Sequence, residues 1–301
     1  MRFEYKIEHG EATLIRCYGS GERVSVPEEL DGYPVTALAP YAFSAGRREP
    51  DAEQAVCGEQ VREIILPGSI RRVGQYAFYG CSRLERLTFS HKEINIAGGV
   101  FMGCRRLKEL VFRMDDPSGY VMKSILSDFR LETKVVLEYP DGRAVLWFPE
   151  YYEEAVENTP ARNVDTCFHG AGYMYRQCFQ DGVFRYAEYD RSFMEATYLE
   201  SEDFCIELAL MRLIYPRELS EDSGGAYRSY LIEHRMSAAL WCIEFDQEEH
   251  LLFLASFIRW REEELEQLIG EAHRHERLSM QSFLMDHKHR NYAKKRKTFE
   301  W

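Results

Sequence analysis

A stretch of sequence that repeats at a fixed spacing of 23 residues constrains the fold of this chain most. Residues 77–89 (AFYGCSRLERLTF) superimpose without a gap on residues 100–112 (VFMGCRRLKELVF). The apolar positions of the repeat also occur one period earlier, where Val61, Ile64 and Leu66 correspond to Leu84, Leu87 and Phe89. A period in the twenties with this apolar spacing predicts a solenoid, whose turns share one core because no turn can bury its own faces.

A second internal match indicates an insertion. Residues 35–43 (VTALAPYAF) align with residues 70–78 (IRRVGQYAF), but the spacing is 35 and not 23. The extra residues fall in 46–57 (GRREPDAEQAVC), which is charged and has no apolar period. We therefore expect an inserted loop at 46–57.

Each repeat predicts one strand with alternating inward and outward side chains. We expect Phe78 and Phe101 to be buried, stacked rings, and Gly80 and Gly103 to form turns with positive φ. The outward residues should form a ladder, because they recur at the repeat spacing, with Arg86 placed between two acids. The candidate binding residues on this strand face are Glu63, Ile65, Arg86, Thr88, Glu109 and Val111.

Three phrases carry a family resemblance: residues 26–38 (VPEELDGYPVTAL), residues 64–70 (IILPGSI) and the two Ala/Val-Phe-x-Gly-Cys-x-x-Leu segments. Over about residues 10–113 the chain resembles the BspA-like leucine-rich repeat family. The resemblance implies a curved parallel solenoid that binds proteins or other macromolecules, with no catalytic residues. Many members of that family are secreted or surface-anchored, whereas this chain shows no signal for either.

After the repeats, residues 114–119 form a turn-rich break. Residues 134–139 and 143–148 flank Pro140-Asp141-Gly142, which predicts a β-hairpin that could cover the open end of the solenoid. From about Pro149 the pattern is helical to the end, with Asp246 expected as an N-cap. The expected helices are 202–215, 226–245, 247–257, 261–274 and 278–292.

These patterns predict an α+β protein, in which a short leucine-rich-repeat β-solenoid precedes a mainly α-helical domain of antiparallel helix pairs. The expected domains are residues 1–115, a connecting and capping segment 116–149, and residues 150–301. Short helix connections favour stacked pairs, as in ankyrin or HEAT arrays, and residues 246–286 faintly resemble an ankyrin unit. A compact, irregular helical domain is the alternative.

The eight cysteines form no Cys-x-x-Cys pair, so we expect reduced, buried thiols. Cys81 and Cys104 should fill the repeat core. Cys167, His169 and Cys178 offer three metal ligands without an evident fourth, and we therefore expect no metal and no cofactor.

The formal net charge of -12 argues against general binding to nucleic-acid backbones. Residues 287–297 (HKHRNYAKKRK) are nevertheless basic, and could bind phosphates, an acidic partner or the acidic helices of this chain, or be a solvated helix end. The basic residues are Lys288, Arg290, Lys294, Lys295, Arg296 and Lys297.

No nucleotide-binding loop, nucleophile elbow or zinc-protease motif occurs. The sequence thus predicts a non-catalytic protein-interaction module or adaptor, which uses the repeat surface and the helical domain and whose partner is another protein. The alternatives are a nucleic-acid-associated protein that uses the basic tail, and an enzyme with a site among the helices. No apolar run is long enough for a membrane span and the N-terminus resembles no signal peptide, so we expect a cytoplasmic protein.

Overall fold

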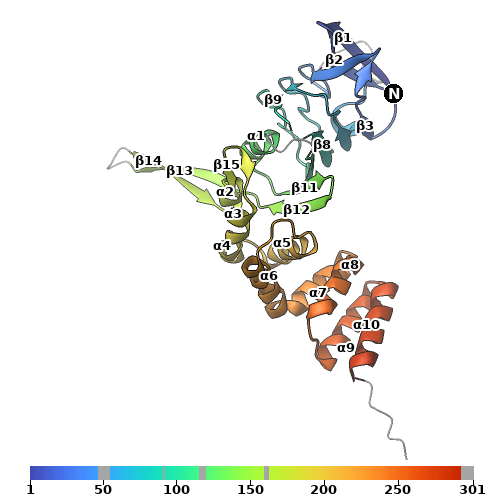
Figure 1. Cartoon of the computed structure of the whole chain (residues 1–301), viewed down its shortest axis with the longest axis vertical. Helices are drawn as coiled ribbons and strands as arrows, with labels where there is room; N and C mark the ends of the chain where they lie inside the picture. Colours follow the sequence, from blue (N-terminus) through green and yellow to red (C-terminus); the bar gives the residue numbers. More distant parts are fainter. Residues whose placement is uncertain (47–54, 91, 115–119, 159–162, 293–301) are drawn as a thin grey trace, which may run out of the picture. The chain divides into compact units, whose positions relative to one another are not determined.

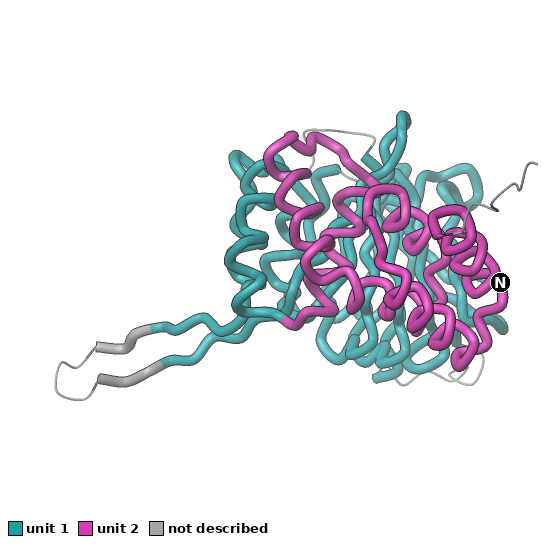
Figure 2. Tube along the Cα trace, turned by 90° about the horizontal axis from the view of Figure 1, so that it is seen from below, with its two compact units in different colours: residues 1–200 teal, residues 201–301 magenta. Residues whose placement is uncertain are grey.

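The computed structural model describes residues 1–46, 55–90, 92–114, 120–158 and 163–292, with the backbone alone at 156–158 and 163–165. The chain has two compact units, Met1–Glu200 and Ser201–Trp301, which are coloured separately in Figure 2. The expected boundaries at residues 115 and 149 lie inside the first unit, and they stay predictions about which segments fold independently.

The first unit contains the solenoid, whose turns contribute to two sheets (Figure 1). The first sheet has the order β12-β11-β10-β8-β6-β3. Its strands are β3 (Arg23–Ser25), β6 (Glu63–Ile65), β8 (Arg86–Ser90), β10 (Glu109–Arg113), β11 (Thr133–Tyr139) and β12 (Gly142–Phe148). All pair in parallel except β11 with β12, which form the predicted hairpin and extend the sheet beyond the last repeat.

The second sheet has the order β1-β2-β5-β7-β9, with β4 also paired to β5. Its strands are β1 (Arg2–Glu8), β2 (Glu11–Tyr18), β4 (Glu29–Leu30), β5 (Tyr33–Leu38), β7 (Arg72–Val73) and β9 (Asn95–Ile96). The β1–β2 hairpin is antiparallel, whereas β2, β5, β7 and β9 are parallel to one another.

The strand register confirms both spacings of the sequence repeat. Leu38 pairs with Val73, which is the spacing of 35. Arg86 pairs with Glu63 and with Glu109, which is the spacing of 23. Most of the expected inserted loop, residues 47–54, lies outside the described residues.

Aromatic rings stack from turn to turn in the core. Phe43 and Phe78 are 5.8 Å apart between ring centroids, and Phe78 and Phe101 are 6.1 Å apart. Phe78 is fully buried as predicted. Phe101 stacks on Phe78 as predicted, but it is only half-buried, so the prediction of its burial was wrong. Phe101 belongs to the last turn of the stack, so one side of its ring meets Phe129 edge-on instead of another turn.

The repeat cysteines are buried as predicted. The Cys81 thiol donates to the Phe43 carbonyl at 3.3 Å, and the Cys104 thiol donates to the Phe78 carbonyl at 3.2 Å. Each thiol therefore satisfies a backbone carbonyl of the preceding turn. Burial raises the pKa of Cys104 to about 12 and that of Cys81 further still, so both remain neutral thiols.

A buried arginine holds the end of the first unit together. Arg176, in α2 (Gly172–Arg176), donates to the carbonyls of Phe129 and Leu131, each at 2.9 Å, and to the carbonyl of Pro149 at 2.5 Å. Burial lowers the pKa of Arg176 only to about 10, so its guanidinium stays charged at neutral pH. The remaining short helices of this unit are α1 (Val121–Asp128), α3 (Tyr186–Arg191) and α4 (Phe193–Leu199).

The expectation of helix from Pro149 onward is wrong for the next segment. β13 (Tyr152–Asn158) and β14 (Asn163–His169) form an antiparallel ribbon that projects from the first unit (Figures 1 and 2). A second small pair, β15 (Phe179–Gln180) with β16 (Val183–Phe184), follows. The ribbon has no helical period, and it includes the strand-favouring residue types Tyr, Val, Thr and Phe.

The second unit is entirely helical where it is described, and its helices lie close to the predicted ranges. They are α5 (Glu202–Ile214), α6 (Glu221–Glu233), α7 (Arg235–Glu244), α8 (Glu248–Phe257), α9 (Glu262–Arg274) and α10 (Leu278–Tyr292). Consecutive helices pack as the pairs α5–α6, α7–α8 and α9–α10, and each pair contacts the next. The chain is therefore α+β, with a β-solenoid followed by antiparallel helix pairs.

Two local predictions in this unit are wrong. The single helix expected over 226–245 is two helices, because the backbone leaves the helical region at His234. Asp246 is not an N-cap but has a φ of +58°, and Gln247 takes the cap position. The carboxylate of Asp246 instead forms an ion pair with Arg277 at 3.3 Å.

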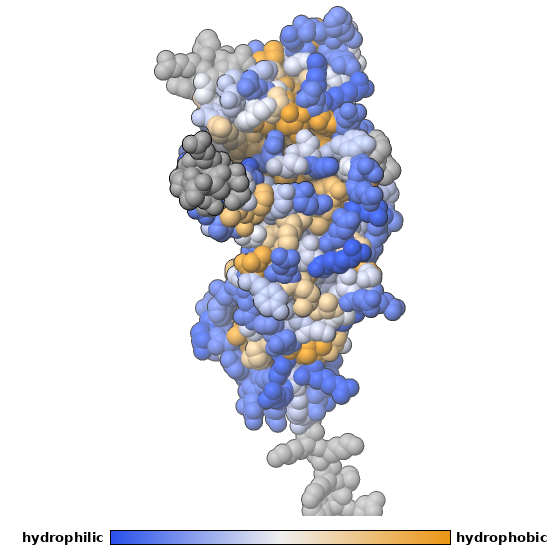
Figure 3. Space-filling view, turned by 90° about the vertical axis from the view of Figure 1, so that its left-hand side faces the viewer, coloured by the Kyte–Doolittle hydropathy of each residue, from blue (hydrophilic) through white to orange (hydrophobic). Residues whose placement is uncertain are grey.

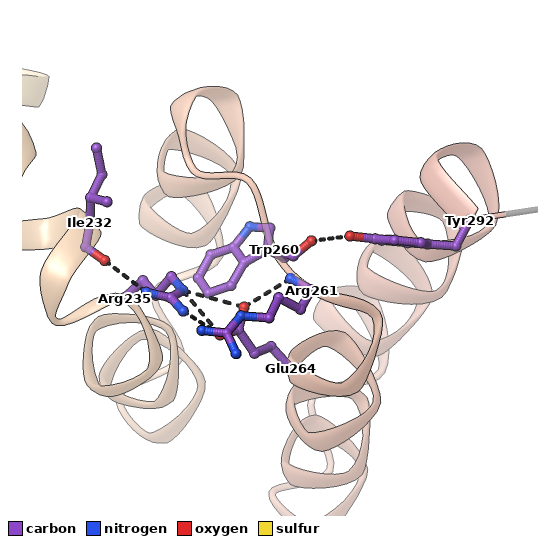
Figure 4. A network of polar contacts seen from close by, with 6 residues as sticks. All are labelled: Ile232, Arg235, Trp260, Arg261, Glu264 and Tyr292. Carbon is purple, nitrogen blue, oxygen red and sulfur yellow. Dashed lines mark hydrogen bonds and ion pairs between the residues drawn. The ribbon is translucent and has the colours of Figure 1, made fainter.

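Polar contacts also join one helix pair to the next (Figure 4). Arg235, at the start of α7, donates through Nε to both carboxylate oxygens of Glu264 in α9, at 3.1 and 3.3 Å. The Tyr292 hydroxyl, at the end of α10, donates to the Trp260 carbonyl just before α9. The contact fixes where α10 ends relative to the first turn of α9.

Candidate protein-binding surface

The predicted outward ladder exists and is longer than expected. In the order of the first sheet it is Arg23, Glu63, Arg86, Glu109 and Lys134. Arg86 lies 3.9 Å from Glu63 and 3.2 Å from Glu109, and the two outer ion pairs measure 3.2 Å (Arg23–Glu63) and 3.8 Å (Lys134–Glu109). Each acid is therefore paired on both sides, which leaves little unpaired charge for a partner.

The other three candidate residues of this strand face, Ile65, Thr88 and Val111, offer less surface than expected. Ile65 and Thr88 pair in register, and Thr88 pairs with Val111. Ile65 is half-buried, but Thr88 and Val111 are only 4% and 1% exposed. Glu63, Arg86 and Glu109 remain accessible on this face, and a binding role for the six residues stays a proposal.

A groove that the sequence did not predict runs over the second sheet. We call it the β2–β9 groove, and its volume is about 800 Å³. It is lined by Lys6, Glu8, Thr13, Ile15, Ala37, Leu38, Ala39, Pro40, Tyr41, Arg72, Val73, Gly74, Asn95 and Ala97. The lining combines a floor of apolar or small residues with a charged rim.

At Gly74 the floor of the groove is formed by the backbone, which packs against residues 38–40. A Cβ atom at Gly74 would lie 2.5 Å from the Pro40 nitrogen and 2.8 Å from the Leu38 carbonyl oxygen. Only glycine therefore lets the two turns approach this closely. On the rim, Arg72 is exposed, and Lys6 and Glu8 form an ion pair at 2.9 Å.

Tyrosines lie at one side of the groove. Tyr41 lines it and stacks on Tyr76 with 5.3 Å between ring centroids, and Tyr79 meets Tyr76 edge-on at 5.7 Å. Tyr41 and Tyr79 are 37% and 40% exposed. The one sequence signal for this cluster was the alignment of Tyr41 with Tyr76.

Hydrophobic residues gather between hydrophilic ones at the N-terminal end of the molecule, at the top of Figure 3.

The possible metal ligands are not brought together. Cys178 is buried and donates to the Met174 carbonyl, Cys167 is exposed, and His169 lies 2.9 Å from Glu154. Within the described ranges no group of three or more His, Cys, Asp or Glu side chains could hold a metal ion. In the same ranges no helix combines the length and the apolar character needed to cross a bilayer.

Only the beginning of the basic tail is described. Lys288 lies 3.4 Å from Glu262 and 2.5 Å from Glu266, and these hydrogen-bonded acids raise its pKa. Arg290 pairs with Asp286 at 2.5 Å. The remaining candidates, Lys294, Lys295, Arg296 and Lys297, lie outside the described residues.

Comparisons with known proteins identify the repeat. Residues 53–125 match the model of the BspA type leucine rich repeat region, in six copies. The chain is similar to the solved leucine rich repeat protein of T. pallidum, with 25% identity over 36% of this chain and 50% of that one and a TM-score of 0.28. It is also similar to a leucine rich cell surface protein from Faecalibacterium prausnitzii A2-165, with 15% identity over 46% of this chain and 41% of that one and the same TM-score, 0.28.

The chain thus spans half or less of the length of these two proteins. No curated protein matches the sequence. The match over 53–125 contains strands β6, β8 and β10, whose register follows the repeat spacing of 23 residues. Residues 53–125 are therefore a BspA-type leucine-rich repeat region.

Proposed function

We propose that this chain is a non-catalytic protein-binding module, and that its recognition surface is the β2–β9 groove with the adjoining tyrosines Tyr41, Tyr76 and Tyr79. The observation that carries the proposal is the groove itself. Solenoids of repeats offer extended surfaces for binding, and this groove is a concave region of the described surface with an apolar floor and a charged rim. Tyrosine is also enriched where proteins meet.

The rim defines the chemistry of the partner. Arg72 is exposed and suits a carboxylate, while the floor around Ala39 and Gly74 suits an apolar side chain. The partner in this proposal is a protein segment that carries an acidic residue beside an apolar one. The ladder on the first sheet serves less well, because its charges already pair with one another.

An adaptor role, with a second binding surface on the helix pairs, is a finer part of this proposal. So is a cytoplasmic location, which the eight cysteines support because all of them are thiols outside any disulfide, and disulfides form in oxidising compartments. That the helix pairs form a true repeat array also belongs here. Its support is that the turns between α7 and α8 and between α9 and α10 both use a residue with positive φ, Asp246 and Glu276.

The test begins with a partner captured by cross-linking from the native host and then purified. Its affinity is measured for the wild-type chain and for Thr13→Arg and Ala39→Arg, which place a long side chain in the groove from half-buried positions. Arg86→Glu is the matched variant on the ladder. We expect each groove variant to weaken binding at least tenfold and Arg86→Glu to change it less than twofold.

The reverse pattern would make the ladder the recognition surface and would refute the groove. Full binding by residues 201–301 alone would assign recognition to the helix pairs instead. Thermal melting of every variant shows whether a loss of binding reflects a loss of fold.

A further inference from the structure

A second groove, of about 900 Å³, lies along α9 and α10 in the helical unit. The side chains from α9 are Glu262, Glu266 and Ile269, and those from α10 include Leu278, Met285 and Tyr292. These positions follow one face of each helix, because they recur at intervals of three, four or seven residues. The groove is therefore the channel between two neighbouring helix faces.

The apolar part of this channel is uncovered. Leu278 is 72% exposed and Met285 is 55% exposed, and they are seven residues apart on one face of α10. In stacked helix pairs such a face is normally covered by the next pair. α9 and α10 are the last helices among the described residues, and no described helix covers this face.

The other end of the channel is acidic. The side chains of Glu262 and Glu266 are 52% and 61% exposed, and both contact Lys288. A carboxylate has about four lone-pair sites, so one lysine leaves acceptor capacity on each of them. Along the channel, acidic side chains near Tyr292 thus give way to apolar side chains near Leu278.

The chain continues from the acidic end. The hydrogen bond from Tyr292 to the Trp260 carbonyl holds the end of α10 beside the first turn of α9 (Figure 4). Residues 293–301 (AKKRKTFEW) follow and lie outside the described residues. Their sequence has four basic residues first and then two aromatic ones, Phe299 and Trp301, which is the order of the channel read from Tyr292 to Leu278.

We propose that residues 293–301 dock in the α9–α10 groove of their own chain. The basic residues meet Glu262 and Glu266, and Phe299 and Trp301 cover Met285 and Leu278. The reach is sufficient: the fifteen residues of α10 from 278 to 292 extend over about 21 Å, and nine residues can span about 30 Å. Charge order, apolar order and length thus agree on one occupant. The proposal is independent of the β2–β9 groove.

The test uses the full chain with 5-fluorotryptophan at its four tryptophans, and follows the ¹⁹F resonance of Trp301. Its assignment comes from the spectrum of Trp301→Phe. The matched variants are Leu278→Asp, in the groove, and Leu252→Asp, at a 40% exposed leucine of α8 outside it. Both positions are exposed enough for the variants to fold, which melting checks.

We expect the Trp301 resonance of the wild type to differ from that of the labelled peptide 293–301 free in solution. Leu278→Asp should return it to the free-peptide position, and Leu252→Asp should leave it unchanged. A wild-type resonance at the free-peptide position would refute docking. A resonance that moves to the free-peptide position on tenfold dilution would show that the tail occupies a second copy, which would also overturn the intramolecular proposal.

Discussion

At the scale of single residues, the buried Arg176 predicts a large effect on the stability of the first unit. Replacing it by methionine keeps most of the volume but leaves the carbonyls of Phe129, Leu131 and Pro149 without this donor. We expect Arg176→Met to lower the free energy of unfolding by about 3–5 kcal/mol, because buried polar groups lose their partner. Urea denaturation measures this, with Arg130→Met as control. Arg130 is half exposed, pairs with Glu153 at the surface and lies over the Tyr151 ring, so a loss of about 1 kcal/mol or less is expected. If both variants lost the same free energy of unfolding, the hydrogen bonds of Arg176 to the three carbonyls would not stabilise the unit as proposed.

Glu200 predicts a pH dependence. Burial is the largest effect and raises the pKa of its carboxyl, while the Ala171 N–H that it accepts at 2.6 Å partly opposes this. A raised pKa in the folded state means that this carboxyl favours folding below its unfolded pKa and loses that contribution as pH rises through the folded pKa. We therefore expect Glu200→Gln to raise the melting temperature relative to wild type more at pH 8 than at pH 4. A difference that is constant with pH, or that grows toward pH 4, would contradict the raised pKa.

At the scale of elements, the turn from α9 to α10 predicts a stabilising substitution. Glu276 has a φ of +57°, a backbone region that costs any residue but glycine about 1–2 kcal/mol. Because glycine also gains entropy in the unfolded chain, we expect Glu276→Gly to raise the free energy of unfolding by a net amount of about 0.5–1 kcal/mol. Gln267→Gly, on the exposed face of α9, should lower it by about 1 kcal/mol. Chemical denaturation measures the free energy of unfolding of both variants. A loss of stability in both would refute the positive φ of residue 276 in this turn.

Some helices and strands could be predicted from the sequence, and others could not. The strands β6, β8 and β10 follow from the repeat, because inward positions such as Leu84 and Leu87 recur at one spacing. Helices α8, α9 and α10 follow from their apolar period, although the N-cap expected for α8 at Asp246 was wrong. The β13–β14 ribbon has neither a repeat nor a helical period to reveal it. The β2–β9 groove was missed for another reason: Thr13, Ala39 and Gly74 come from different turns and share no residue type.

At the scale of the whole molecule, the contacts of residues 171–200 predict where the first unit ends. The Tyr189 hydroxyl bonds to the backbone N–H and carbonyl of Trp147, at 2.9 and 2.7 Å, and Arg176 reaches back to Phe129. We expect residues 1–200 to melt in one cooperative transition, as seen by near-ultraviolet circular dichroism. Residues 1–150, which end near the boundary expected from sequence, should melt at a lower temperature or not cooperatively. Equal melting of the two fragments would favour the earlier boundary.

The ladder Arg23–Glu63–Arg86–Glu109–Lys134 has a consequence for how such a solenoid can change length. Signs alternate from one turn to the next, so duplicating a single 23-residue turn sets two like charges side by side, which destabilises neighbouring strands. Duplicating or deleting two turns together keeps every pair opposite. The alternating charges of the ladder therefore favour the gain or loss of turns in even numbers, because an odd number would place two like charges on neighbouring strands.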